Sequence, residues 1–234
     1  MKPLDQLPSL TDRVYDAIVD EICEGRLPAS THLVQEQLAT RLGVSRQPIQ
    51  QALALLKADG LIEEVGKRGM HVASLDLKAM RHHYDIRAAL DALAARKAAA
   101  HAKDSLSVTA DLERRGQKIL EAGREAIEKG GVARQIREDK AFHGLFYEVS
   151  GNPFLHRTAE PHWRFLRRIM GEVLRHAEPP RSIWHQHQEL LEAVVAGDQE
   201  QSERLAVDHI QRAADMLEMA IKSGGLEQRP ASNG

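Results

Sequence analysis

The chain has 234 residues, of which 42% are hydrophobic, 28% charged and 4% aromatic, and its formal net charge is −2. This length suits one or two globular domains, and no apolar run approaches the roughly 18–20 residues of a membrane-spanning helix. A single cysteine, Cys23, excludes an internal disulfide, and the N-terminus lacks an apolar signal core, so we expect a cytoplasmic protein without a membrane partner.

Apolar residues at helical spacing predict a first amphipathic helix over residues 10–25. Its apolar positions are Leu10, Val14, Ile18 and Ile22. Thr11 is the predicted N-cap and Gly25 the predicted end. Leucines at positions 33, 38 and 42 predict a second helix over residues 33–42, which ends at the Gly43-Val44 turn.

A third helix is predicted over residues 45–60, with Ser45 as its N-cap and Pro48 in its first turn, where the missing N–H does no harm. Its buried stripe consists of Ile49, Leu53 and Leu56. Two short helices joined by a tight glycine turn are typical of a helix-turn-helix, whose second helix enters a DNA groove. The third helix is therefore the predicted recognition helix.

A β-hairpin is predicted after the third helix, with strands over residues 61–65 and 70–73. Its turn carries Lys67 and Arg68, which could lie along a phosphate backbone or reach into the minor groove. Residues 1–75 are therefore predicted to form a winged helix-turn-helix that binds double-stranded operator DNA.

Overall charge gives no support to DNA binding by this domain. Residues 1–75 contain 8 Lys and Arg against 10 Asp and Glu, whereas DNA-binding domains are usually strongly basic. Binding must then depend on a local patch, for which the candidates are Arg41, Arg46, Lys67 and Arg68.

From residue 76 to about residue 223 the pattern predicts only helices, as expected for an all-α bundle. The helices are predicted near residues 77–103, 107–129, 132–149, 153–176, 180–196 and 199–222. Glycine and proline pairs separate them, and residues 224–234 are predicted to be a disordered tail. The expected fold class is mainly α, with a small β wing in the N-terminal domain and a helical C-terminal domain.

Residues 33–73 resemble the winged helix-turn-helix of GntR-type bacterial transcription regulators. The helical remainder resembles the FadR branch and its FCD effector domain, in the shorter VanR-like form. The motifs that carry this second resemblance are YDIRAALDALAARKAA from residue 84, DKAFHGLFYEVSGNP from residue 139 and HQELLEAVVAGD from residue 187. The resemblance implies a homodimer whose domain 76–223 dimerises and binds an effector.

Two positions depart from the family pattern in the DNA-binding domain. Gln50 stands where the recognition helix usually has a second arginine, and Glu36 stands where the preceding helix often has one. Glutamine can still read adenine N6 and N7 in the major groove, and we expect Arg46 to make the strongest contact. The predicted DNA-contacting residues are Arg41, Ser45, Arg46, Gln47, Gln50, Gln51, Lys67 and Arg68.

A second constellation of residues predicts a metal centre. Asp139 and His143 are four residues apart on one predicted helix and so share a face, and His187 and His209 lie near the middle of the last two helices. The resemblance implies that these four bind a divalent ion and selects His187 over His185. One carboxylate and three imidazoles suit zinc first, with nickel or another first-row metal as alternatives.

The resemblance also places an arginine, here Arg87, in the effector cavity, where its guanidinium would bind a small organic acid. Asp91, one turn later, could orient Arg87. Trp163, Arg164 and Arg167 are further candidates for the cavity wall. The remaining histidines are predicted to be surface or packing residues: His82, His83, His101, His156, His162 and His176.

The sequence therefore predicts a ligand-responsive transcription regulator, with repression as the expected outcome, that senses a small carboxylate through a metal-containing domain. Two alternatives remain. One is a metal-dependent hydrolase with a DNA-binding head, because an open Asp/His site can activate water; the chain has no HExxH motif and no clearly placed general base. The other is a regulator whose histidines only pack and bind no metal.

Overall fold

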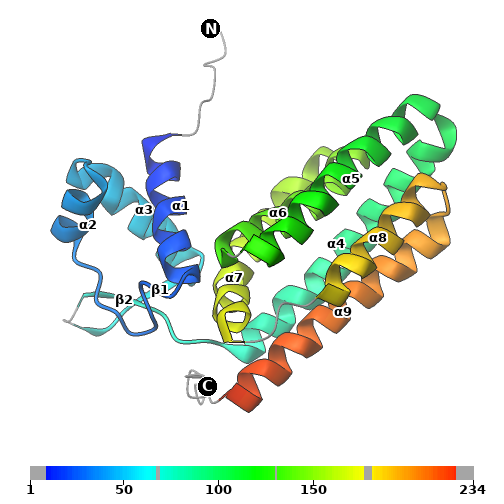
Figure 1. Ribbon diagram of the computed structural model, residues 1–234. Helices are drawn as coiled ribbons and strands as arrows, with labels where there is room; N and C mark the ends of the chain where they lie inside the picture. The colour runs from blue at the N-terminus through cyan, green and yellow to red at the C-terminus, as the bar shows by residue number, and fades with distance from the viewer. Residues whose placement is uncertain (1–8, 67–68, 130, 177–180, 225–234) are drawn as a thin grey trace, which may run out of the picture. The chain divides into compact units, whose positions relative to one another are not determined.

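The computed structural model describes residues 9–66, 69–129, 131–176 and 181–224, and its helices dominate the view in Figure 1. The chain divides into two compact units, with the boundary between Leu75 and Asp76. The predicted wing tip, Lys67-Arg68, and residues 225–234 of the predicted tail lie outside the described residues. Within the described ranges, no helix combines the length and the hydrophobicity required of a bilayer-spanning segment.

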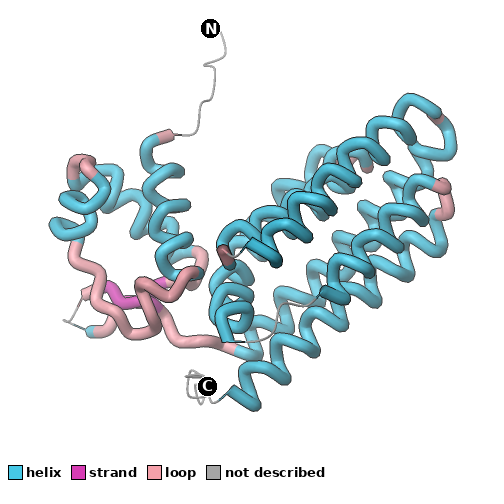
Figure 2. The backbone as a smooth tube through the Cα atoms, in the orientation of Figure 1, coloured by secondary structure: helices cyan, strands magenta, loops and turns pink. Residues whose placement is uncertain are grey.

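Within the described ranges, the first unit consists of three helices and a two-stranded antiparallel wing. Figure 2 shows the strands of the wing in magenta. Its elements are α1 (Leu10–Cys23), α2 (Gln35–Leu42), α3 (Arg46–Ala58), β1 (Ile62–Glu64) and β2 (Met70–Val72). The stripe Ile49, Leu53 and Leu56 of α3 is buried and packs against α1, as predicted. Cys23 is a small buried residue of α1.

The N-cap of α1 is Ser9, and the prediction of Thr11 was wrong. The Ser9 hydroxyl accepts the Asp12 backbone N–H, and the Asp12 carboxylate accepts the Ser9 backbone N–H, so that each residue satisfies a free donor of the other. Thr11 lies inside the helix and donates its hydroxyl to Gln51 Oε1 of α3 at 2.7 Å. Leu10, the first residue of α1, is exposed and does not belong to the buried face, contrary to the prediction.

Leu33 lies in an extended segment before α2, although the leucine spacing predicted it inside the helix. Its N–H donates to the Met70 carbonyl of β2 at 2.8 Å, and the Ser30 N–H donates to the Val72 carbonyl at 2.9 Å. The segment thus adds to the edge of the wing. It still buries Leu33, because an extended residue can present its side chain to the same core as a helix.

The turn between α2 and α3 depends on Gly43. This residue has φ 64°, a left-handed conformation that glycine adopts without a steric penalty, and it caps the C-terminus of α2. Ser45 then occupies the N-cap position of α3 with extended backbone, and its hydroxyl makes no capping hydrogen bond. That hydroxyl remains on the exposed face at the start of the recognition helix.

The second unit is an antiparallel helical bundle built around its longest helix. Its elements are α4 (Leu77–Asp104), α5 (Leu106–Lys129), α6 (Val132–Val149), α7 (Pro153–His176), α8 (Arg181–Val195) and α9 (Gln199–Gly224). Helix α4 runs alongside α9 and contacts each of the other four helices (Figure 1). All six observed helices lie within two residues of the predicted ranges.

A stripe of alanines lets α4 pack closely in the middle of this bundle. The stripe consists of Ala94, Ala95, Ala98, Ala99 and Ala102, and all five are buried. Their small side chains leave room for the large ones of neighbouring helices, including Phe142, Trp163 and Trp184. The chain can thus bring polar residues from several helices to one centre inside the core.

Gly123 of α5 leaves the space that the Trp184 indole of α8 occupies. A Cβ added at Gly123 would overlap that ring, which is buried. We expect Gly123→Ala to lower the free energy of unfolding by about 1–3 kcal/mol, as overpacking usually does. Urea unfolding measures the change.

Gly144→Ala in α6 is the matched control, because a Cβ there would meet no atom within 4 Å. It should instead raise stability by about 0.5–1 kcal/mol through helix propensity. Equal effects of the two alanines would show that Trp184 is not tightly packed against α5.

Candidate metal centre and nucleic-acid interface

Asp139 and His143 of α6, His187 of α8 and His209 of α9 converge on one point inside the bundle. One ligand atom from each residue lies within 4.8 Å of the others. The three histidines are buried, with exposed fractions of 1%, 0% and 4%, and Asp139 is half-buried. The structure therefore brings together the four residues that the sequence predicted as a metal-binding set.

The facing atoms of this cluster are imidazole Nε2 atoms and one carboxylate oxygen. His187 Nε2 lies 3.1 Å from His209 Nε2 and 3.3 Å from Asp139 Oδ1. His143 Nε2 lies 3.9 Å from the same oxygen and finds no hydrogen-bond partner among the residues that the structure describes. One ring N–H can satisfy the His187–His209 contact, but His143 Nε2 then still lacks a partner, whereas a cation between the three rings and the carboxylate would satisfy all four groups.

Hydrogen bonds to residues outside the cluster fix which ring nitrogen of His143 and of His209 carries the proton. His143 Nδ1 lies 2.9 Å from Asp91 Oδ1, and His209 Nδ1 lies 3.1 Å from Gln186 Oε1. Both oxygens are acceptors, so each Nδ1–H donates and each Nε2 presents a lone pair to the centre. Partners of this kind usually orient metal-binding histidines and raise their basicity. The donor set and its surroundings fit a divalent first-row metal.

Burial controls the charge of the cluster. It lowers the pKa of His187 and His209 well below 6.5, with a further contribution from neighbouring histidines, so both rings are neutral near pH 7. Burial also raises the pKa of Asp139, although His143 and Arg87 oppose the shift. Neutral imidazoles are the form that binds metal, and a cation would offset the cost of burying the Asp139 carboxylate.

The same burial predicts how stability depends on pH in the metal-free protein. Burial lowers the pKa of His83 to about 4, and His187 and His209 also titrate below the unfolded value of 6.5. The unfolded chain thus binds more protons than the folded one between pH 6.5 and 4, so stability falls as the pH falls through this window. Burial also lowers the pKa of His162 and so adds to the trend, while Asp139, with its raised pKa, opposes it.

We therefore expect protein treated with a chelator to melt at a lower temperature at pH 5 than at pH 7.5, by differential scanning calorimetry. Between pH 7.5 and 8.5 these histidines are neutral in both states, so they contribute no change there. A melting temperature that stays constant or rises on acidification to pH 5 would contradict the neutral buried imidazoles.

Arg87 of α4 is buried beside the cluster. Its guanidinium carbon lies 3.6 Å from the centroid of the Trp163 ring, and its Nε lies 3.5 Å from Asp91 Oδ2. Neither Nε nor Nη2 of Arg87 has a hydrogen-bond partner within the described ranges. A buried guanidinium with unused donors is suited to a carboxylate ligand.

Asp91 faces Arg87, the residue that the sequence suggested it could orient, and it also contacts His143 of the metal-binding set, which the sequence did not suggest. Its Oδ1 accepts from His143 Nδ1 and from the Tyr147 hydroxyl at 2.8 Å, while Oδ2 faces Arg87. Burial would raise the pKa of Asp91, but His143 and Arg87 outweigh it and the net shift is downward. Asp91 and His143 are 52 residues apart, so no local pattern could have revealed their contact.

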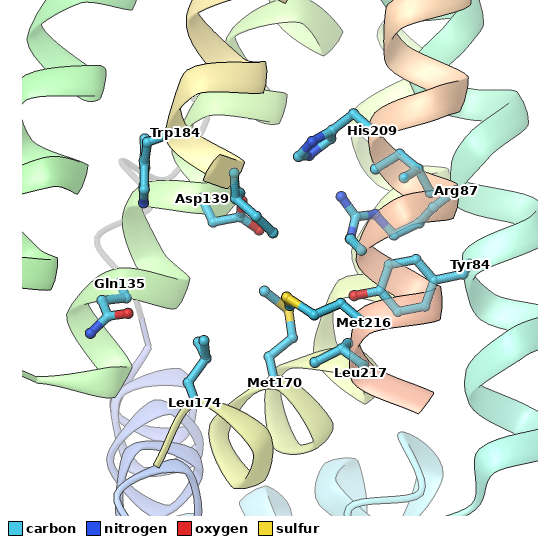
Figure 3. A pocket seen from close by; sticks show the side chains of 13 residues that line it. Tyr84, Arg87, Gln135, Asp139, Met170, Leu174, Trp184, His209, Met216 and Leu217 are labelled. Carbon is cyan, nitrogen blue, oxygen red and sulfur yellow. The ribbon is translucent and has the colours of Figure 1, made fainter. Parts of the chain in front are cut away.

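A pocket with a cavity volume of about 50 Å³ opens onto the cluster (Figure 3). Its lining residues are Tyr84, Arg87, Gln135, Asp139, Met170, Leu174, Ile183, Trp184, His209, Ile210, Ala213, Met216 and Leu217. Arg87 lines the pocket as predicted. Trp163, Arg164 and Arg167 are not among these lining residues; Trp163 instead stacks on Arg87, and Arg164 pairs with Glu160.

The other histidines of the second unit lie outside the cluster. His185 is exposed and lies 3.5 Å from Glu189, so the structure places His187 and not His185 at the centre. His83 and His162 face each other, with their Nδ1 atoms 2.9 Å apart, and His101 Nδ1 donates to the Val149 carbonyl at 2.7 Å.

The exposed side of the recognition helix α3 carries Arg46, Gln47 and Gln50. Arg46 Nη2 forms an ion pair of 2.8 Å with Glu36 of α2. Gln51 is turned toward α1, where its side-chain oxygen accepts from Thr11.

Arg41 and Lys57 are also held by acidic residues. Arg41 Nη2 lies 2.8 Å from Glu21, and Lys57 Nζ lies 2.7 Å from Glu64. Arg41, Arg46 and Lys57 are thus each paired with a carboxylate, which agrees with the absence of a positive surplus.

Two family models match the chain, one for each unit. Residues 10–72 match the bacterial regulatory proteins of the gntR family, and residues 82–212 match the FCD domain. Similar curated proteins are transcription regulators rather than enzymes. The repressor RspR of Escherichia coli K12 is 24% identical over 214 residues, which cover 92% of this chain and 91% of that protein.

A further relative is described as "Probable D-xylose utilization operon transcriptional repressor" of Paenarthrobacter nicotinovorans. It is 29% identical over 222 residues, which cover 94% of this chain and 92% of that protein. Among solved structures, Escherichia coli McbR/YncC superposes with a TM-score of 0.76 at 23% identity, over 91% of this chain and 99% of that one. The chain therefore belongs to the GntR family of DNA-binding bacterial transcription regulators, with an FCD domain as its second unit.

Proposed function

We propose that this regulator is a repressor of the FadR branch, which acts in the cytoplasm, binds operator DNA as a homodimer and senses a small carboxylate through a metal centre in its FCD domain. The observation that carries the proposal is the buried convergence of Asp139, His143, His187 and His209 at the wall of a pocket that also contains Arg87. Two similar proteins are named as repressors, which supports the direction of regulation.

The four clustered side chains would hold the ion, and zinc suits this mixture of imidazole and carboxylate donors, with nickel as an alternative. The bound ion would supply positive charge and open coordination positions to an anionic ligand. Arg87 would bind the same carboxylate through its unused N–H donors, and Asp91 would hold both Arg87 and His143 in position.

Ligand binding is proposed to change the affinity for operator DNA by favouring one arrangement of the two DNA-binding units in the dimer. A two-fold dimer presents two recognition helices to the two halves of a palindromic site. Coupling of this kind is reciprocal, so operator DNA must change the affinity for the ligand by the same factor.

The test is a screen of small carboxylic acids by thermal shift, with and without a chelator, followed by operator-binding measurements with each acid that binds. We expect stabilisation that grows with acid concentration and disappears with the chelator. Bound acid should then change operator affinity. The proposal fails if acids that demonstrably fill the pocket leave DNA affinity unchanged.

Elemental analysis separates this proposal from a regulator whose histidines only pack. Purified protein should contain one divalent ion per chain, and His187→Ala should contain none. Sedimentation equilibrium should give the mass of a dimer. A metal-free parent protein that still responds to an acid would support the alternative.

A further inference from the structure

The pocket has two chemically different ends, and from them we infer the class of effector: a monocarboxylate with an unbranched or compact apolar body, rather than a dicarboxylate or a polyhydroxylated acid. The inference rests on the proposed function, because it assumes that the pocket beside the metal-binding cluster is the effector site. It goes further by assigning a role to the side of the pocket that faces away from that cluster.

The polar end consists of side chains that would bind a carboxylate. Asp139 and His209 belong to the metal-binding set, and Arg87 presents donors that have no partner within the described ranges. Figure 3 shows these three on one side of the pocket, with the Tyr84 hydroxyl pointing in beside them. A carboxylate at this end could contact the bound ion and the guanidinium together.

The opposite end is apolar. Its side chains come from α7 and α9 and are Met170, Leu174, Met216 and Leu217 (Figure 3). Ile183, Ile210 and Ala213 are further apolar residues of the pocket lining. Met170, Leu174 and Met216 are only half-buried in the bundle, so a ligand body could remove more of their surface from water. Methionine side chains also adapt readily to the shape of an apolar ligand.

This surface discriminates against ligands with a second polar group. Among the described lining residues, Arg87 carries the only permanent positive charge, and it lies at the polar end. A second carboxylate or several hydroxyls would lose water against methionine and leucine side chains, and the uncharged amide of Gln135, a further lining residue, could replace only part of that hydration, which is costly. A methylene chain placed there gains about 0.8 kcal/mol for each buried CH₂, or about fourfold in affinity.

The experiment uses the full-length, zinc-loaded protein and the series acetate, propionate, butyrate, pentanoate and hexanoate. Trp184 lines the pocket and Trp163 stacks on Arg87, so quenching of intrinsic fluorescence reports binding, with calorimetry as a second readout. We expect affinity to rise about fourfold for each added methylene until the apolar end is filled. Butyrate should bind at least about tenfold more tightly than succinate, and hexanoate at least about tenfold more tightly than gluconate.

Two methionines of α9 provide a matched pair of variants. Met216→Gln places an amide of similar length in the apolar end, and it should reduce the preference for hexanoate over acetate while leaving acetate affinity within about twofold. Met219→Gln makes the same change at a residue that is 71% exposed and outside the pocket lining, and it should leave the whole series unchanged.

The outcomes distinguish this inference from the proposed function. If affinity is independent of chain length, or if succinate or gluconate binds as tightly as its matched monocarboxylate, the inference is wrong although a carboxylate site exists. If no carboxylic acid binds the zinc-loaded protein at all, the proposed function itself fails. Equal effects of the two methionine variants would also contradict the assignment of the apolar end.

Discussion

Replacing His187 with alanine is expected to lower the affinity for zinc by more than about 100-fold. Loss of an outer hydrogen-bonding partner of a metal ligand typically costs about 10- to 100-fold, and loss of a ligand itself should cost more. His187 is the central member of the set, since its Nε2 lies within 3.3 Å of Asp139 Oδ1 and 3.1 Å of His209 Nε2. Competition with a chromophoric chelator measures the affinity.

His185→Ala is the matched control, because His185 lies two positions earlier on the same helix with its side chain 76% exposed. It should leave zinc affinity unchanged. Asp91→Asn should fall between the two, about 10- to 100-fold weaker than the parent, because it weakens the orientation of His143 but removes no ligand. Equal zinc affinity of His187→Ala and His185→Ala would disprove the metal centre.

Replacing Arg46 with alanine is expected to lower operator affinity by roughly 30-fold to 20,000-fold. A bidentate contact from arginine to guanine contributes about 1–3 kcal/mol, and a dimer loses the contact at both half-sites. Arg46 stands at the first position of α3, where a recognition helix meets the bases. Fluorescence anisotropy with operator and scrambled duplexes at two salt concentrations measures the loss.

Two further variants of this surface are expected to change DNA binding in different ways. Gln50→Ala should mainly relax sequence preference, since an exposed glutamine reads base edges without adding charge. Glu36→Gln should strengthen binding to both duplexes, because it frees Arg46 from its 2.8 Å ion pair. If Arg46→Ala binds operator as tightly as the parent, α3 does not read DNA in the proposed way.

The helices of this chain were predictable because their signals are local. Glycine and proline residues mark the breaks, and apolar spacing gives the faces, so the boundaries agree to within two residues. The errors arose where two local signals competed. Ser9 and Thr11 are both good N-caps, and only Ser9 has an acidic residue three positions later to complete the reciprocal pair. Leu33 fits the leucine spacing of the second helix, but its backbone N–H donates to a carbonyl of β2, so the residue lies in an extended segment.

The candidate site was predictable only in part. Spacing placed Asp139 and His143 on one face of a helix. The convergence of His187 and His209 with them depends on how three helices pack, and only the family resemblance predicted it. The Asp91–His143 contact joins helices 52 residues apart and has no sequence signature. The apolar end of the pocket likewise arises from α7 and α9 together.

The ion pairs of the DNA-binding unit bear on how the regulator would search a genome. Chromosomal DNA offers about 10⁶–10⁹ competing sites, which hold a protein through its unshielded cations. Here Arg41, Arg46 and Lys57 each have a carboxylate partner in the free protein. Exposed pairs of this kind are weak, about 0–1 kcal/mol, so a well-fitting operator can exchange carboxylate for phosphate at small cost. Breaking these pairs costs the same on random sequence as on the operator, but only the operator adds base contacts that offset the cost, so a larger share of the molecules stays free to sample operators.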